Sequence, residues 1–236
     1  MDSIQARLQQ VQEQIRNAAE QAGRQGDKIE LLAVSKTRPV PDIEAAMAAG
    51  QVAFGENYLQ DALSKIEALR DSSAQWHFIG RIQSNKTRPI AENFDWVHSL
   101  DSIKHAQRLN DQRPEQLTAL NICLQVNIDQ QASKGGLTPE QLPEAIDKIQ
   151  AMPRLKLRGL MVIPAPATEL EAQRQPFSQL RQLRDNLATP ELPLETLSMG
   201  MSGDLTAAIM EGATIVRIGT AIFGPRPPMN RTSNNA

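Results

Sequence analysis

Residues 194–224, LETLSMGMSGDLTAAIMEGATIVRIGTAIFG, decide how this chain folds. Two apolar runs in this stretch predict buried strands, and each ends in a turn where a glycine stands beside a hydroxyl. The turn after the first strand, which ends at Ser198 and Met199, contains Ser202, Gly203 and Asp204, and the turn after the second contains Gly219 and Thr220. Backbone N–H groups at such turns bind phosphate, so the sequence predicts a phosphate site where the two strands end.

Arg217 precedes the second turn by two residues and would leave its strand beside this site. Its guanidinium could either bind the phosphate or donate a hydrogen bond to an aromatic nitrogen of the same ligand. The residues alone leave both roles open. Ordinary turns and a solvated strand end would have a similar composition, but two such turns at successive strand ends favour the phosphate site.

The rest of the chain alternates strands with helices. Apolar runs predict strands at 29–36, 52–57, 76–80, 94–100, 120–127 and 155–163. Together with the two strands of 194–224 they make eight, and strict alternation with helices indicates a parallel sheet. We therefore expect an α/β fold, a single (β/α)8 barrel of the TIM type with an extra N-terminal helix at 2–22. The expected domain is 1–226, and 227–236 is expected to be a flexible tail.

Composition restricts the class of partner. The net charge is −2 at pH 7 and basic residues form no block, so neither nucleic acid nor a membrane surface is an expected partner. The single cysteine, Cys123, lies in an apolar run and is expected to be buried in a strand of a cytoplasmic protein. The histidines lack the spacing of metal ligands, and we expect no metal site. Alanine-rich helices without an apolar surface stripe favour a monomer.

Lys36 ends the first predicted strand, in AVSKT. Strand exits of a barrel share one face, so Lys36, Asn57, His77, Ser202 and Arg217 would meet at one mouth. An apolar strand end lowers the pKa of a lysine and leaves a neutral amine that can form a Schiff base. A surface lysine along the rim would have the same sequence, but an amine and a phosphate site together are the two attachments that pyridoxal phosphate needs.

A lysine aldolase acting on a phosphorylated sugar would use the same parts. In such barrels the Schiff base lysine usually lies on a later strand and has carboxylates beside it for proton transfer. The first-strand position of Lys36, with Arg217 near the phosphate turn, favours the cofactor instead.

Seven motifs between residues 33 and 224 are shared with one known family, and the resemblance extends over about residues 4–226. The motifs are AVSKT, FGENY, WHFIGRIQSNK, KGGL, GLMVI, SMGMSGD and VRIGTAIFG. They resemble the pyridoxal phosphate homeostasis family, also called the YggS or PROSC family. The resemblance implies a barrel like the N-terminal domain of alanine racemase that binds pyridoxal 5′-phosphate without established catalytic turnover.

The resemblance also implies residue roles. Lys36 would form the Schiff base, and Arg217 would face the pyridine nitrogen and keep it unprotonated, which weakens the ring as an electron sink. The phosphate would be held by Ser202, Gly219 and Thr220 with Gly203 adjacent, and the cofactor would be lined by Asn57, His77, Ser198 and Met199. Gly203 departs from the family pattern, in which a larger polar residue is common at this position. No residue is assigned a catalytic role.

The implied function is intracellular pyridoxal phosphate homeostasis, in which the protein carries or buffers the cofactor or delivers it to apoenzymes that depend on it. The alternative is a minor amino acid racemase or lyase that uses the same lysine. A racemase needs a second base from a separate β domain, and we expect none because the barrel occupies nearly all of the 236 residues. A phosphosugar enzyme without pyridoxal phosphate is a third hypothesis.

Overall fold

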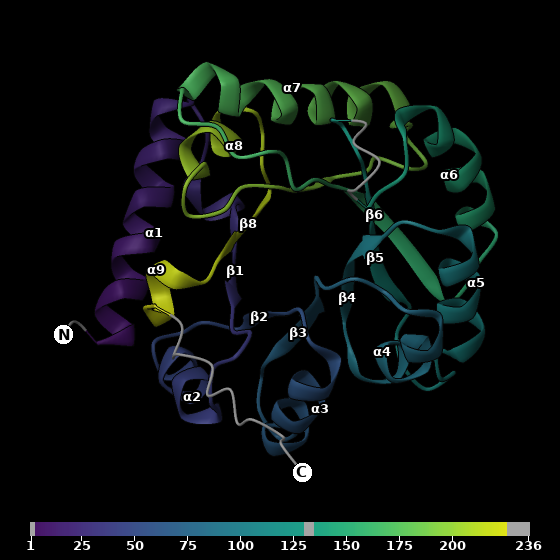
Figure 1. Cartoon of the computed structure of the whole chain (residues 1–236), viewed down its shortest axis with the longest axis horizontal. Coiled ribbons are helices and arrows are strands. Elements are labelled where there is room, and N and C mark those ends of the chain that lie inside the picture. The colour runs from purple at the N-terminus through teal and green to yellow at the C-terminus, as the bar shows by residue number, and fades with distance from the viewer. Residues whose placement is uncertain (1–2, 130–134, 226–236) are drawn as a thin grey trace, which may run out of the picture.

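The computed structural model describes residues 3–129 and 135–225, and within these ranges the strands form a closed barrel (Figure 1). Each strand pairs in parallel with the next, and the last closes on the first. The strands are β1 (Glu30–Val34), β2 (Ala53–Glu56), β3 (Gln75–Phe78), β4 (Trp96–Leu100), β5 (Leu120–Gln125), β6 (Leu155–Met161), β7 (Thr196–Ser198) and β8 (Ile215–Ile218). The predicted (β/α)8 barrel is confirmed.

Helices surround the ring of strands (Figure 1). They are α1 (Ile4–Gln21), α2 (Val40–Ala48), α3 (Leu59–Ala68), α4 (Thr87–Asn93), α5 (Ile103–Gln112), α6 (Leu142–Gln150), α7 (Leu170–Leu187), α8 (Leu205–Met210) and α9 (Thr220–Phe223), with 3-10 turns η1 (Gly26–Lys28), η2 (Ser84–Lys86) and η3 (Pro139–Gln141). The extra N-terminal helix is α1, which packs against α8 and α9. Among the described residues, no helix is long and apolar enough to cross a membrane.

Alternate residues of a strand face opposite sides of the barrel wall. In β1, Leu31 and Ala33 join the core shared with the helices, whereas Leu32 and Val34 pack inside the barrel with Ile215. The barrel interior is therefore a packed core and not a channel. Polar groups that bind a ligand have to lie where the strands end.

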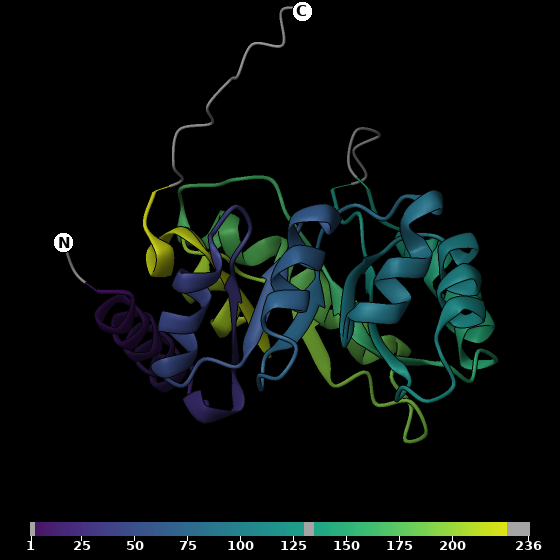
Figure 2. The ribbon, with the colours of Figure 1, turned by 90° about the horizontal axis from the view of Figure 1, so that it is seen from below.

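The two ends of the barrel differ in what they carry. In the side view of Figure 2, the purple entry into β1 lies at the bottom of the barrel and the yellow helix α9 lies near the top. The top is the carboxyl end of the strands, where the loops after β1, β7 and β8 come together. The predicted tail, 227–236, lies outside the described residues.

Cys123 of β5 is fully buried, as predicted. Burial raises the pKa of its thiol above its usual range, so the thiol stays protonated and packs as a small apolar group.

Candidate functional site

Lys36 lies in the turn that follows β1, two residues beyond the end of the strand, and is half-buried. This turn touches the segment after β8. Arg38 Nη2 donates a hydrogen bond to the carbonyl oxygen of Pro225 (2.8 Å), and a Cβ atom at Gly219 would lie 3.1 Å from the carbonyl oxygen of Val34. Lys36 and the turn after β8 therefore lie on the same rim of the barrel.

The turn after β7 begins at a position that requires glycine. Gly200 has φ +95°, and a Cβ atom there would lie 2.6 Å from a side-chain carbon of α8. The backbone N–H of Met201 then donates to Asp204 Oδ1 (2.6 Å), which closes the turn and leaves Ser202 and Gly203 exposed at its tip. No atom lies within 4 Å of a Cβ placed at Gly203, so a larger residue would fit there without moving the backbone.

The turn after β8 continues directly into a short helix, as the strict alternation of strands and helices predicted. Gly219 precedes the four-residue helix α9, and its carbonyl oxygen accepts the backbone N–H groups of Ile222 (3.0 Å) and Phe223 (2.9 Å). Thr220 begins the helix with its side chain exposed at the rim. The first N–H groups of a helix have no partner within it, so they can donate hydrogen bonds to an oxyanion bound at this end.

Arg217 is buried beside these turns, with 5% of its surface exposed. Its Nη1 donates to Ser198 Oγ (2.8 Å) and its Nη2 to the carbonyl oxygen of Val162 (2.9 Å), both of which are neutral. Burial lowers its pKa to about 10, while the charge of Asp204 acts in the opposite direction. A buried cation bonded to neutral groups is costly, and an electron-rich ligand at the rim would lower that cost.

Two histidines support Arg217 from inside the barrel. Ser198 Oγ lies 2.7 Å from His98 Nδ1, and His98 Nε2 lies 2.9 Å from His77 Nδ1. Arg217 can only donate, so Ser198 Oγ accepts its hydrogen bond. His98 lies between Ser198, on its Nδ1 side, and His77, on its Nε2 side, and joins the two.

Burial keeps both histidines neutral. It lowers the pKa of His77 to about 3 and that of His98 well below its usual value, and the neighbouring His77 and the Arg217 cation lower the pKa of His98 further. Trp96 stacks on the ring of His77, with 5.4 Å between the ring centroids. The neutral side chains of His77, His98 and Ser198 therefore form a hydrogen-bonded support that fixes the direction of the Arg217 guanidinium.

These shifts predict a loss of stability in acid. Unfolded histidines titrate at about pH 6.5, far above the buried pair, so between these values the unfolded chain binds more protons. The free energy of unfolding should fall as the pH falls below 6.5, by about 1 to 3 kcal/mol per pH unit for the pair. Urea unfolding between pH 7.5 and 4.5 measures this slope.

A His98→Gln variant should reduce the acid slope by about half, because one of the two titrating groups is gone. Glutamine carries a donor and an acceptor, as a neutral histidine does, so it can bond to both Ser198 and His77. The difference in stability at pH 7.5 measures the cost of the substitution apart from titration. An unchanged slope would contradict the neutral pair.

Other predicted residues lie deeper than the rim or face away from it. His77 is fully buried and reaches Arg217 only through His98 and Ser198. Met199 is fully buried in the core shared by strands and helices, so its backbone alone borders the rim. Asn57 is half-buried at the end of β2, and its buried Oδ1 has no hydrogen-bond partner among the described residues.

The sequence reasoning missed His98 as part of this site. The signal was present, because His98 stands two residues after Trp96, and both face the barrel interior with His77.

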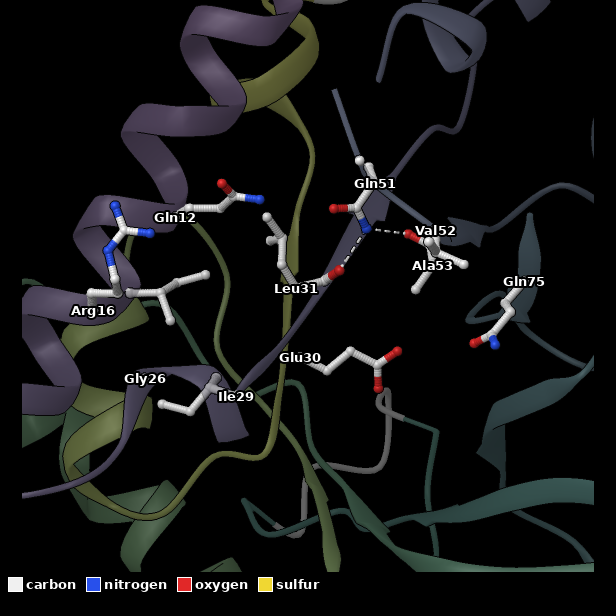
Figure 3. Close-up of a pocket in the computed structure, with 12 residues that line it drawn as sticks. Gln12, Arg16, Gly26, Ile29, Glu30, Leu31, Gln51, Val52, Ala53 and Gln75 are labelled. Carbon is white, nitrogen blue, oxygen red and sulfur yellow. Dashed lines mark hydrogen bonds between the residues drawn. The ribbon is translucent and has the colours of Figure 1, made fainter. Parts of the chain in front are cut away.

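A separate cavity lies at the other end of the barrel (Figure 3). It has a volume of about 440 Å³ and is lined by α1 and by the entries into β1, β2 and β3. Gln51 borders it and donates from Nε2 to the carbonyl oxygens of Leu31 and Ala53 (both 2.7 Å), and Glu30 points away from Arg16. Because Lys36 follows the opposite end of β1, this cavity is separate from the candidate site.

Comparison with known proteins identifies the family. Residues 6–227 match the family model described as alanine racemase, N-terminal domain. A pyridoxal phosphate homeostasis protein of Pseudomonas aeruginosa is 55% identical over 226 residues, which cover 96% of this chain and 97% of that protein. The chain belongs to the pyridoxal phosphate homeostasis family. The resemblance drawn from the seven motifs is confirmed.

Solved structures extend this result. PipY of Synechococcus elongatus, solved with pyridoxal phosphate bound, is 36% identical to this member of the pyridoxal phosphate homeostasis family, with a TM-score of 0.83 over 94% of this chain and 100% of PipY. An alanine racemase of Clostridium difficile has a TM-score of 0.74 but only 15% identity, which shows a shared fold alone. That match covers 96% of this chain and 58% of the racemase.

Proposed function

We propose that this protein binds pyridoxal 5′-phosphate through Lys36 and holds the cofactor in reserve, buffering or delivering it without strong turnover of a substrate. The observation that carries the proposal is PipY, a relative solved with pyridoxal phosphate bound and matched over 94% of this chain. The rim supports the same ligand, because an amine, a buried guanidinium and two turns lie together there.

In this proposal each rim residue has one task. Lys36 would hold the cofactor by a bond from its amine to the aldehyde carbon, formed with loss of water and reversed by hydrolysis. Arg217 donates a hydrogen bond to the pyridine nitrogen. The phosphate is held by Ser202, Gly219 and Thr220 with Gly203 adjacent. The ring is bordered by Asn57, Ser198 and the backbone of Met199, and His77 supports it from behind His98 and Ser198. The unit that binds the cofactor is the barrel of 1–226.

The surroundings of Arg217 favour a protein that binds the cofactor over one that uses it to turn over a substrate. When bound, pyridoxal phosphate supplies an electron sink whose strength depends on protonation of the pyridine nitrogen. Arg217, with a pKa of about 10, keeps its proton at neutral pH and donates only a hydrogen bond. Behind it, His98 and His77 are fully buried and neutral, and they cannot supply a proton from the rim.

The test is chemical trapping of the wild-type protein. Protein incubated with pyridoxal phosphate should develop a visible absorption band that borohydride removes, and peptide mass analysis should locate one reduced pyridoxyl phosphate group on Lys36. Adduct spread over several surface lysines, or no band at all, would contradict the proposal.

The proposal extends to partners. The protein acts as a monomer in the cytoplasm and gives its cofactor to apoenzymes that depend on pyridoxal phosphate. Size-exclusion chromatography with light scattering tests the monomer, and recovery of activity by an apoenzyme mixed with the loaded protein tests delivery. Recovery no faster than with an equal concentration of free cofactor would contradict delivery but not binding.

A further inference from the structure

A buried cluster of charged side chains lies directly behind the Lys36 turn, on the helix side of the barrel wall. Lys65 of α3 donates from Nζ to Glu56 Oε1 (2.8 Å) and to Asp61 Oδ2 (2.6 Å). The Lys65 and Glu56 side chains are 4% and 0% exposed, and the Asp61 side chain is 41% exposed. We call Lys65, Glu56 and Asp61 the Lys65 cluster. Its position on α3 and β2 places it outside the ligand rim.

The Lys65 cluster holds the residue before Lys36 by two hydrogen bonds. Lys65 Nζ donates to the carbonyl oxygen of Ser35 (2.9 Å), and Ser35 Oγ donates to Glu56 Oε1 (2.6 Å). Ser35 is therefore drawn towards the helix side of the wall. The backbone is therefore fixed where it enters the turn that carries Lys36.

The Lys65 cluster also holds the residue after Lys36. The backbone N–H of Thr37 donates to Asp61 Oδ2 (3.2 Å), the same oxygen that accepts from Lys65. Thr37 has φ +63°, in the left-handed region that a β-branched residue rarely adopts. Such a conformation persists only where surrounding contacts enforce it, and it is typical of functional positions.

We propose that the Lys65 cluster is a positioning device that fixes the backbone on both sides of Lys36 and so aims its amine at the cofactor aldehyde. This inference rests on the proposed function, in which Lys36 is the attachment residue. A buried ion cluster contributes little net stability compared with apolar packing, so a role in specifying one backbone geometry accounts for its presence. Asp61 is the member to test, because it is partly exposed and can be changed without burying a new charge.

The first measurement separates binding from bond formation. Stopped-flow absorbance at increasing pyridoxal phosphate gives the affinity of the initial complex and the limiting rate at which Lys36 reacts. Asp61→Ala should lower the limiting rate about tenfold with the initial affinity unchanged, because misplaced reacting groups slow the bond-forming step. Asp61→Asn keeps an oxygen for the Thr37 N–H and should stay within about threefold of wild type.

The matched control is Glu67→Ala on the same helix. The Glu67 side chain is 67% exposed and pairs with Arg70 at the surface, away from the Lys65 cluster. The Glu67→Ala protein should react with pyridoxal phosphate at the wild-type rate. A loss in Asp61→Asn equal to that in Asp61→Ala would assign the effect to charge and would overturn the positioning role.

The second measurement needs no cofactor. Amide hydrogen exchange of the unloaded protein should be at least about tenfold faster at Thr37 in Asp61→Ala than in wild type, with the amides of β5 unchanged. Unchanged exchange at Thr37 would overturn the inference. If exchange responds as expected but wild-type Lys36 does not react with pyridoxal phosphate, the proposed function fails and the positioning of the Lys36 backbone stands.

Discussion

A Lys36→Ala protein mixed with pyridoxal phosphate is expected to show no visible absorption band and no adduct after borohydride. The side chain removed is the amine that lies half-buried at the carboxyl rim, on the same side as the turns after β7 and β8. Without it the cofactor can be held only by hydrogen bonds to its phosphate and ring. Absorbance between 300 and 500 nm, a window that is roughly that of lysine-bound cofactors, and intact-protein mass measure the loss.

The matched control for Lys36 is Lys86→Ala. Lys86 ends η2, after β3, and is half-buried at the same rim. Its removal changes the local charge by the same amount, so a loss of nonspecific attraction for the phosphate would affect both variants alike. The Lys86→Ala protein should retain the band and the borohydride adduct. A band that survives in Lys36→Ala, or one that is lost in both variants, would show that another amine binds the cofactor.

The barrel was predictable because its signals are local. Each strand and helix is marked by its own run or periodicity, and alternation of the two is sufficient to indicate a parallel sheet. Strand ends were less predictable. The first strand was expected to include Lys36, but it stops at Val34, because the Ser35 carbonyl oxygen accepts from Lys65 and the Ser35 hydroxyl donates to Glu56.

The support of the site was not predictable, because it joins residues far apart in the chain. His98 and Ser198 are 100 residues apart and meet only after the barrel has closed. Lys65 follows the helical pattern of a solvated face, yet it is buried, because its partners come from the preceding strand and turn. A sequence motif can identify the residues at the rim, but it does not show which buried side chains orient them.

An Arg217→Met protein is expected to bind pyridoxal phosphate about 100-fold more weakly, a change of about 2.7 kcal/mol. The guanidinium is the buried cation at the rim and bonds only to neutral oxygens in the described residues, so its charge is available to the ligand. Methionine has a similar length but cannot donate. Equilibrium titration followed by absorbance measures the affinity, and urea unfolding of the unloaded protein measures its stability.

The stability of the unloaded protein decides how the Arg217 result is interpreted. Removing the guanidinium leaves the carbonyl oxygen of Val162 without this donor, but it also removes a buried charge, so the free energy of unfolding should change by less than about 2 kcal/mol. Arg158→Met is the matched control. Arg158 belongs to β6, and its guanidinium lies over the ring of Trp96 of β4, away from the rim turns. It should keep wild-type affinity. If Arg217→Met also kept that affinity while losing stability, the guanidinium would serve the barrel core and not the ligand.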